Sequence, residues 1–289
     1  MSTLADGPAP AGVPGGRAGF PERGLLLLLA AVQFTHVLDF MVMMPLGPQL
    51  MRELGMTPGR FSALVSAYTV AAGVVGLLAA PFIDRHDRRT LLLGTYLGFI
   101  AGTAACAMAR SGEGLLAARV LCGAFGGVSG ALVLATVGDL VPPERRGAGL
   151  GLVMTSFSVA SALGVPLGLS LAQRLRWEAP FVFIALLSVV TWILLWRHLP
   201  AVRGHLDDGG AGGWGPFLGL VRDANALRGL LFMASLVFGH FMVIPLMSPF
   251  FVGNVGLPEG RLFLVYLVGG LASVVPSARV GRMGDRHRR

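Results

Sequence analysis

The sequence predicts an all-α membrane protein with about eight transmembrane helices. Apolar residues make up 54% of the 289 residues and charged residues only 13%, whereas a soluble domain carries about 25% charged residues. The mean hydropathy of +0.71 agrees. The chain also contains eight apolar runs, each close to the roughly 17–25 residues that a helix needs to cross the hydrocarbon. These observations disfavour a water-soluble globule and exclude disorder for most of the chain.

The basic residues indicate how the helices are oriented. All 23 are arginines, which give the net charge of +8, and all except Arg119, which lies within the fourth run, fall between or beside the apolar runs or at their ends. A nucleic-acid-binding protein would instead carry them along one exposed face, so the predicted partner is a lipid bilayer and not nucleic acid. With a cytoplasmic N-terminus, sixteen arginines lie in inner segments and six in outer segments. The positive-inside rule therefore predicts a multi-pass protein of the inner (plasma) membrane with its N-terminus in the cytoplasm.

The elements follow in order along the chain. Residues 1–23 are rich in Gly, Pro and Ala without periodicity, and we expect them to form a flexible N-terminal arm. The predicted spans are Gly24–Met51, Phe61–Ile83, Thr90–Ala109, Leu115–Val141, Gly147–Ala172, Pro180–Trp196, Gly229–Gly253 and Leu262–Val280.

A long connection divides these spans into two unequal parts. Residues 198–228 contain the Gly-rich stretch GHLDDGGAGGWG and are predicted to form a cytoplasmic central loop. The loop separates an N-terminal six-helix bundle, residues 24–197, from a partial C-terminal bundle of two helices, residues 229–289.

The part after the loop begins as a second copy of the first. A shift of 201 positions aligns the identical segments 40–42 and 241–243 (FMV), 84–86 and 285–287 (DRH), and Gly55 with Gly256. Two copies of six spans in the same orientation form a parallel repeat. The chain therefore looks like eight spans of an intended twelve.

Four ionisable residues lie inside the predicted spans, where a charge at the bilayer centre costs about 2.5–3.5 kcal/mol and generally marks a functional site. They are His36 and Asp39 in the first span, Arg119 in the fourth and His240 in the seventh. His36 and Asp39 share a helix face, and the repeat aligns Asp39 with His240. Two alternatives stay open: Asp39 and Arg119 as a structural ion pair, and the histidines as satisfied cavity residues.

Over about residues 24–289 the chain resembles the major facilitator superfamily, in particular its drug and sugar efflux branch of proton antiporters. The segment APFIDRHDRRT is similar to the family's G-x-x-x-D-R-x-G-R-R turn, with Asp84, Arg85, Arg88 and Arg89 in place and Ala80 and Asp87 where glycines are usual. A second copy of this turn, GRMGDRHRR, contains Gly281, Asp285 and Arg286. In the fourth span, RVLCG resembles the family's R-x-x-x-G motif with Arg119 and Gly123. In the fifth span, GVPLG resembles the Gly-Pro motif of the sugar and purine efflux relatives with Gly164, Pro166 and Gly168.

The residues of these motifs also have a physical interpretation that does not depend on the family. Asp84 is expected to accept hydrogen bonds from a helix N-terminus, while the arginines beside it face the anionic inner leaflet; a simple topological anchor is the alternative. The resemblance implies that this turn latches the two halves. Gly123, Gly164 and Gly168 are spaced for close helix approach. The alternative for Gly164 and Gly168 is that, together with Pro166, they let the fifth span bend.

The resemblance further implies that the first, fourth and seventh spans line a central cavity, where Asp39, Arg119 and His240 converge. Our hypothesis is that Asp39 carries the proton, that His36 and His240 tune or relay it, and that Arg119 holds an anionic or polar group of the substrate.

The expected function is secondary active transport: proton-coupled efflux of a small organic solute, such as a drug, sugar or related metabolite, by alternating access. The partners are then the solute and protons, with the proton gradient as energy source and no cofactor or metal. The chain is not expected to be an enzyme, because it lacks nucleophile-elbow, zinc-protease and phosphate-loop motifs. Cys106 and Cys122 have neither metal nor disulfide spacing and are interpreted as small core residues.

The alternative is a non-transporting truncated membrane fragment or scaffold, because the second copy stops after the eighth span. Self-association or the missing second-half helices would then be the protein partners.

Overall fold

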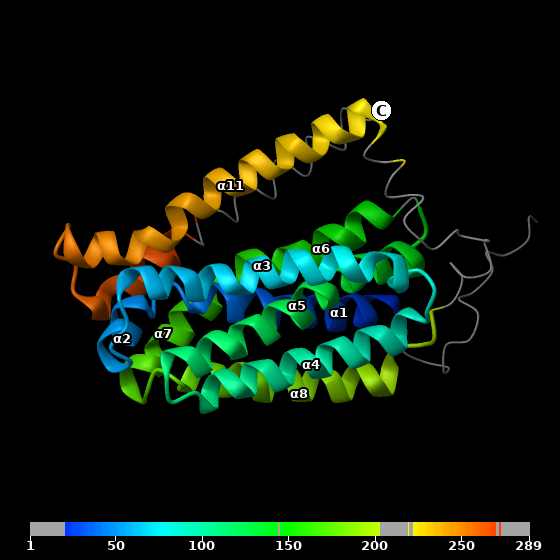
Figure 1. Ribbon diagram of the computed structural model, residues 1–289. Coiled ribbons are helices and arrows are strands. Elements are labelled where there is room, and N and C mark those ends of the chain that lie inside the picture. The colour runs from blue at the N-terminus through cyan, green and yellow to red at the C-terminus, as the bar shows by residue number, and fades with distance from the viewer. Residues whose placement is uncertain (1–20, 144, 203–218, 220–221, 270–271, 273–289) are drawn as a thin grey trace, which may run out of the picture.

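The structure is a computed structural model that describes residues 21–143, 145–202, 219, 222–269 and 272. All elements in that part are helices (Figure 1), which confirms the predicted all-α class. They are α1 (Glu22–Val42), α2 (Gly47–Glu53), α3 (Pro58–Ile83), α4 (Arg88–Met108), α5 (Gly112–Leu140), α6 (Arg146–Val159), the π-helical turn η1 (Ala160–Gly164), α7 (Val165–Arg174), α8 (Ala179–His198), α11 (Ala224–Gly253) and the 3-10 turn η2 (Glu259–Arg261).

Six helical segments of the described chain are long and apolar enough to cross a membrane. They are α1, α3, α4, α5, the continuous segment Arg146–Arg174 and α8, and they match the first six predicted spans. The seventh predicted span lies in α11, which has 30 residues. The eighth is described over residues 262–269 and at residue 272, where it is helical. Most of the predicted N-terminal arm and central loop lie outside the described residues.

The structure divides the first predicted span into two helices. We expected one helix from Gly24 to Met51, but α1 ends at Val42 and residues 43–46 form a turn before α2 begins. Pro45 explains the break, because proline lacks an amide hydrogen and disfavours the helical conformation of the residue before it.

The predicted internal repeat has a structural counterpart. Shifted by 201 positions, the stretch covered by α1 and α2 coincides with α11, which continues as one helix where the first copy breaks. Gly55 and Gly256 also align, and among the described residues they are the glycines with a positive φ, at 61° and 72°. The same left-handed turn therefore follows α2 in the first copy and α11 in the second, and glycine fits it because it has no Cβ.

The six spans run up and down, so that alternate connections gather at one end of the bundle (Figure 1). At one end, Arg145 pairs with Glu22 at 3.1 Å, and the amide of Arg88 donates to the carbonyl of Val202 at 3.3 Å. These contacts join the start of α1, the α3–α4 and α5–α6 connections and the segment after α8. Most of the described arginines that were predicted to lie in inner segments belong to this end.

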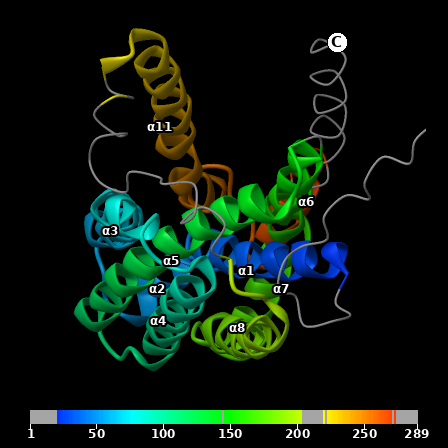
Figure 2. The ribbon, with the colours of Figure 1, turned by 90° about the vertical axis from the view of Figure 1, so that its right-hand side faces the viewer.

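The helix α5 packs closely against α3 and α4 on one side of the bundle (Figure 2). A Cβ added to Gly123 would overlap the carbonyl oxygen of Tyr68 and lie 2.8 Å from its Cα, and one added to Gly127 would lie 2.7 Å from the Cα of Ala72. The two backbones are therefore in contact, which is the close approach predicted for Gly123.

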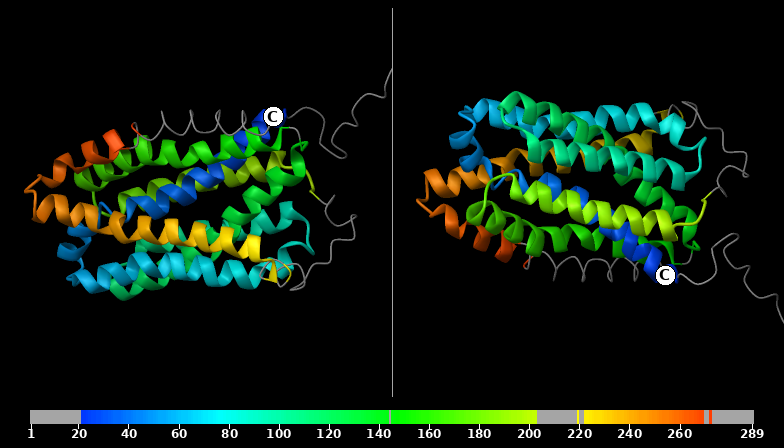
Figure 3. Two further views of the ribbon diagram at one scale, coloured as in Figure 1. Left: turned by 90° about the horizontal axis from the view of Figure 1, so that it is seen from above. Right: turned by 90° about the horizontal axis from the view of Figure 1, so that it is seen from below.

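Outward faces of the spans are apolar. Val70 and Leu78 on α3 and Leu186 on α8 are 57–63% exposed, which is the arrangement that a lipid-facing surface requires. The helix α11 meets the bundle beside α2 and diverges from it towards its own start (Figures 1 and 3).

We predict that Gly123→Ala destabilises the bundle while Gly138→Ala does not. Both positions lie in α5, so the gain in helix propensity is the same, but a Cβ at Gly138 meets no atom within 4 Å. Overpacking at Gly123 should cost about 1–3 kcal/mol or more because its neighbour is backbone. Thermal unfolding in detergent, followed by tryptophan fluorescence, measures both; equal melting temperatures would contradict the prediction.

Candidate functional site

The predicted residues Asp39 and Arg119 form an ion pair inside the bundle. Nη1 of Arg119 lies 2.6 Å from Oδ2 of Asp39, and both side chains are fully buried. Asp39 is in the last turn of α1 and Arg119 in the second turn of α5, so the pair joins the first and fourth spans.

Further contacts fix the pair in place. The hydroxyl of Thr103 on α4 donates to Oδ1 of Asp39 at 3.4 Å, and the guanidinium of Arg119 stacks over the ring of Tyr68 on α3, 4.5 Å from its centroid. An aromatic face attracts a desolvated cation by about 2 kcal/mol. Four spans therefore meet at this pair of charges.

A cavity of about 510 Å³ lies beside the pair and is lined by α1, α3, α5 and α6. These helices form the side of the bundle that faces α11 (Figure 2). Its walls are largely aromatic and aliphatic, with Phe40, Met41, Met44, Tyr68 and Phe157 among the lining side chains. The polar side chains of Gln33, His36 and Thr69 also line it. Neither Asp39 nor Arg119 belongs to the described lining.

His36 and Gln33 are the lining residues whose buried polar atoms have no partner. His36 is 4% exposed and Gln33 8%, and within the described structure neither the ring nitrogens of His36 nor Oε1 of Gln33 has a hydrogen-bond partner. The His36 ring packs edge-on against Phe99 and Tyr96, with centroids 4.3 and 5.4 Å away. Buried polar groups normally find a partner, so these groups are available to a bound molecule.

The structure brings together only part of the predicted constellation. Asp39 and Arg119 converge, while His36 lies on the cavity side of α1 and packs against α4. His240 belongs to α11, but its side chain lies outside what the structure describes. Sequence reasoning missed Gln33, Thr103 and Tyr68, whose residue types are ordinary in membrane helices and gave no signal.

Span five shows the close approach predicted for Gly164 and Gly168 and also an irregular helical segment. Cβ atoms at Gly164 and Gly168 would lie 2.8 Å from Leu38 and 2.6 Å from Val42 of α1, so these glycines allow close helix approach. The helix also changes to a π-helical turn at Ala160–Gly164, directly before Pro166. Such turns interrupt the regular hydrogen bonding of a helix, and this one lies opposite the part of α1 that carries Asp39.

The turn between α3 and α4 forms a second polar cluster. Arg88 is 8% exposed at its side chain and pairs with Asp139 at 2.7 Å and with Asp84 at 3.1 Å. Nη2 of Arg89 donates to the carbonyl of Trp196 at 2.6 Å. Asp139 was not predicted, although an acidic residue at the end of an apolar helix was a visible signal. Arg85 flanks the cluster and is exposed.

Two expectations for this turn are wrong. Asp84 does not cap a helix start: it is the C-terminal cap of α3, and Asp87 caps α4 by accepting from the amide of Arg89 at 3.0 Å. Arg88 does not face the leaflet, because Asp139 draws it into the bundle. The second copy of the motif, with Gly281, Asp285 and Arg286, lies outside the described residues, and the predicted latching of the two halves stays a prediction.

Asp87 also holds the segment that follows α8. Its Oδ1 accepts from the amide of Val202 at 3.1 Å, while the carbonyl of Val202 accepts from the amide of Arg88 at 3.3 Å. Asp87, which stands where the family usually has glycine, thus fixes the start of the central loop to the turn between α3 and α4.

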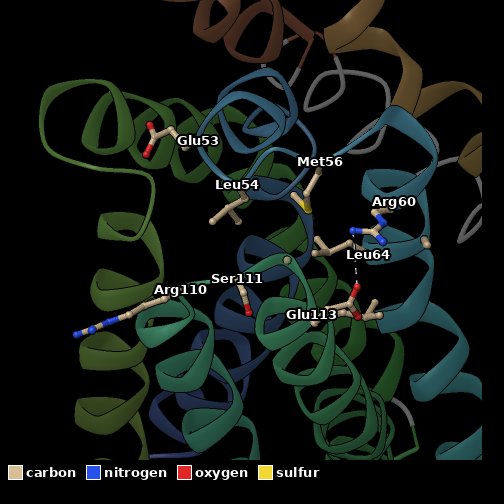
Figure 4. Close-up of a pocket in the computed structure, with 11 residues that line it drawn as sticks. Glu53, Leu54, Met56, Arg60, Leu64, Arg110, Ser111 and Glu113 are labelled. Carbon is tan, nitrogen blue, oxygen red and sulfur yellow. Dashed lines mark ion pairs between the residues drawn. The ribbon is translucent and has the colours of Figure 1, made fainter.

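Another cavity, of about 390 Å³, opens at the opposite end of the bundle (Figure 4). Arg60 of α3 and Glu113 of α5 point toward each other across it with 3.9 Å between their charged atoms. Both side chains are more than 70% exposed, so water screens their attraction. The cavity contains none of the predicted site residues, and no cluster in the described chain could hold a metal ion.

The family model of the Major Facilitator Superfamily matches residues 29–289. The chain therefore belongs to this family of membrane transporters, and it is a multi-pass membrane protein. It is 28% identical over 262 residues to a chloramphenicol resistance protein of Streptomyces lividans, covering 91% of this chain and 67% of that protein. A probable sugar efflux transporter of Mannheimia succiniciproducens is 26% identical over 218 residues, covering 74% of this chain and 54% of that protein. The chain thus spans between about half and two thirds of the length of these relatives.

Solved structures support the fold. A bacterial homolog of the human lysosomal transporter Spinster, in an inward-facing and unoccupied conformation, matches with a TM-score of 0.68 at 17% identity and covers 86% of this chain and 59% of that one. The human organic anion transporter MFSD10 matches with a TM-score of 0.66 at 19% identity and covers 91% of this chain and 73% of that one.

We predict that Asp139→Asn lowers stability more than Asp84→Asn. Both variants remove one carboxylate from Arg88, but the side chain of Asp139 is 25% exposed and that of Asp84 is 59% exposed. The first should cost about 1–2 kcal/mol and the second about 0.5 kcal/mol or less. Melting temperatures in detergent measure both. An equal or larger loss in Asp84→Asn would show that Asp139 does not hold Arg88.

Proposed function

We propose that the chain serves proton-coupled efflux of a small organic solute by alternating access. In this proposal it lies in the inner membrane with its N-terminus in the cytoplasm, and the proton gradient drives it without a cofactor. The observation that carries the proposal is the buried Asp39–Arg119 pair between α1 and α5, set beside a cavity of about 510 Å³.

The pair can convert a proton into a mechanical change. Ionised Asp39 attracts Arg119 and holds α1 against α5. A proton on Asp39 cancels that attraction, while Arg119 keeps its contact with the face of Tyr68. Phe40, which follows Asp39, and Tyr68 both line the cavity, so a change at the pair moves the cavity wall. Binding of the proton and binding of the solute are thereby coupled.

This assignment gives Arg119 a different role from the one suggested by the sequence. Nη1 of its fully buried guanidinium is bound to Asp39, and Arg119 does not line the cavity. We therefore assign it to holding the proton carrier and not to holding an anionic substrate, although Nε and Nη2 have no hydrogen-bond partner within the described structure. Gln33 and His36 then provide the polar contacts to the solute.

The cavity favours an uncharged solute of mixed polarity. One carboxamide, one imidazole and the hydroxyl of Thr69 lie among aromatic and thioether side chains, and the described lining contains no arginine, aspartate or glutamate. Relatives named for chloramphenicol resistance and for sugar efflux support a small organic solute.

We predict that Asp39→Asn abolishes proton coupling in the protein that remains folded. The variant is made in the whole reading frame that encodes this chain and assayed in inverted vesicles, with chloramphenicol and a neutral disaccharide as solutes and a pH-sensitive dye as readout. Solute-driven proton movement should fall at least about tenfold, because asparagine cannot bind and release a proton.

The matched control is Glu113→Gln, which removes an exposed carboxylate and should transport normally. Proton coupling that survives in Asp39→Asn would leave the pair with a structural role only. Absence of transport in the unsubstituted protein would favour the alternative of a non-transporting fragment or scaffold.

We further predict that His36→Leu raises KM for the solute without removing proton coupling. Leucine fills a similar space between Phe99 and Tyr96 but offers no hydrogen bond, and a lost hydrogen bond to a buried polar group costs about 1–3 kcal/mol, or about five- to 150-fold in affinity. Solute transport as a function of concentration measures the effect. An unchanged KM with reduced maximal rate would instead place His36 in the proton path.

A further inference from the structure

The only two cysteines of the chain meet inside the bundle. Cys106 is on α4 and Cys122 on α5, both are fully buried, and their Sγ atoms lie 3.8 Å apart. Their sequence separation of sixteen residues did not predict this contact, because the turn between α4 and α5 folds one helix back on the other.

The helices are close enough here for a covalent link. A Cβ added to Gly102, one turn before Cys106, would lie 2.9 Å from both the amide nitrogen and the Sγ of Cys122. A disulfide requires Cβ atoms about 3.5–4.5 Å apart, a condition that most helix pairs fail because their backbones stay too far apart. The absence of a side chain at Gly102 removes this obstacle.

The two sulfurs also adjoin the Asp39–Arg119 pair. Sγ of Cys122 lies 3.7 Å from the hydroxyl of Thr103, and that hydroxyl donates to Oδ1 of Asp39 at 3.4 Å. Cys122 is one turn after Arg119 on α5, so both side chains lie on the same face of the helix. One side chain, Thr103, separates the sulfurs from the carboxylate.

We propose that Cys106 and Cys122 form a thiol–disulfide site whose oxidation alters the surroundings of Asp39. The electron acceptor in this reaction is a membrane-permeant diazene oxidant. Two S–H bonds break and one S–S bond forms, and two electrons and two protons pass to the N=N bond, which becomes a hydrazine. The S–S bond of about 2.05 Å replaces the 3.8 Å contact. Cys122 then loses its S–H group and moves relative to Thr103, which changes how the Thr103 hydroxyl bonds to Asp39.

Counting free thiols tests whether Cys106 and Cys122 form a disulfide. The purified 289-residue chain is treated with diamide in detergent, quenched, denatured and labelled with a polyethylene glycol maleimide, and the labels are read as gel shifts. We expect two labels before oxidation and none after it, without a disulfide-linked dimer. Cys106→Ser and Cys122→Ser should each keep one label throughout. Two labels that persist after oxidation, or a loss of labels only through dimers, would overturn the proposal.

Carbodiimide labelling tests the link to Asp39 without any transport assay. Dicyclohexylcarbodiimide reacts with protonated carboxyl groups in apolar surroundings, and mass spectrometry locates the product at Asp39. Oxidation should change its rate by at least about twofold, because Thr103 joins the sulfur and the carboxylate in one hydrogen-bonded network. The variant with both cysteines replaced by serine should show no response to diamide. Equal rates in the reduced and oxidised protein would overturn the coupling.

Discussion

Asp39 and Arg119 place two opposite charges among helices whose outer faces are apolar, where neither charge could stay alone. Removing one partner of a buried ion pair generally costs about 3–5 kcal/mol, because the other charge remains without compensation. In this chain the pair has no solvent contact. Thr103 donates to Asp39, the ring of Tyr68 lies under the guanidinium, and the carbonyl of Asp39 accepts a second bond from Nη1 of Arg119 at 3.4 Å. Four spans are thereby held at one point, and the cavity beside them takes its shape from that arrangement.

Small residues make this convergence geometrically attainable. Gly123 lets α3 and α5 touch at the backbone of Tyr68, the residue that stacks on Arg119, and Gly164 lets span five approach Leu38, the neighbour of Asp39. Larger side chains at either position would separate the helices that carry the pair. The motif glycines therefore let the helices that carry Asp39 and Arg119 come into contact. The π-helical turn before Pro166 places an irregular segment of span five next to this contact.

The sequence predicted those parts of the molecule that depend on long periodic patterns. The six spans, the shared ends of the arginine-rich connections and the pairing of Asp39 with Arg119 follow from hydropathy and from the cost of charge in hydrocarbon. Residues that act through a single contact were missed. Asp139 binds Arg88, and Cys106 contacts Cys122. Asp87, and not Asp84, caps α4. Each of these contacts depends on the rotation of one helix against another, which composition does not encode. The break after Val42 was visible at Pro45 but was outweighed by the surrounding apolar run.

A double-mutant cycle on Asp39 and Arg119 tests the central claim most directly. The free energy of unfolding is measured in detergent for the unsubstituted protein, Asp39→Asn, Arg119→Gln and the double variant. If the pair holds α1 on α5, each single variant loses about 3–5 kcal/mol, and the double variant loses clearly less than the two losses together. Additive losses would show that the two charges do not depend on each other and would contradict the account.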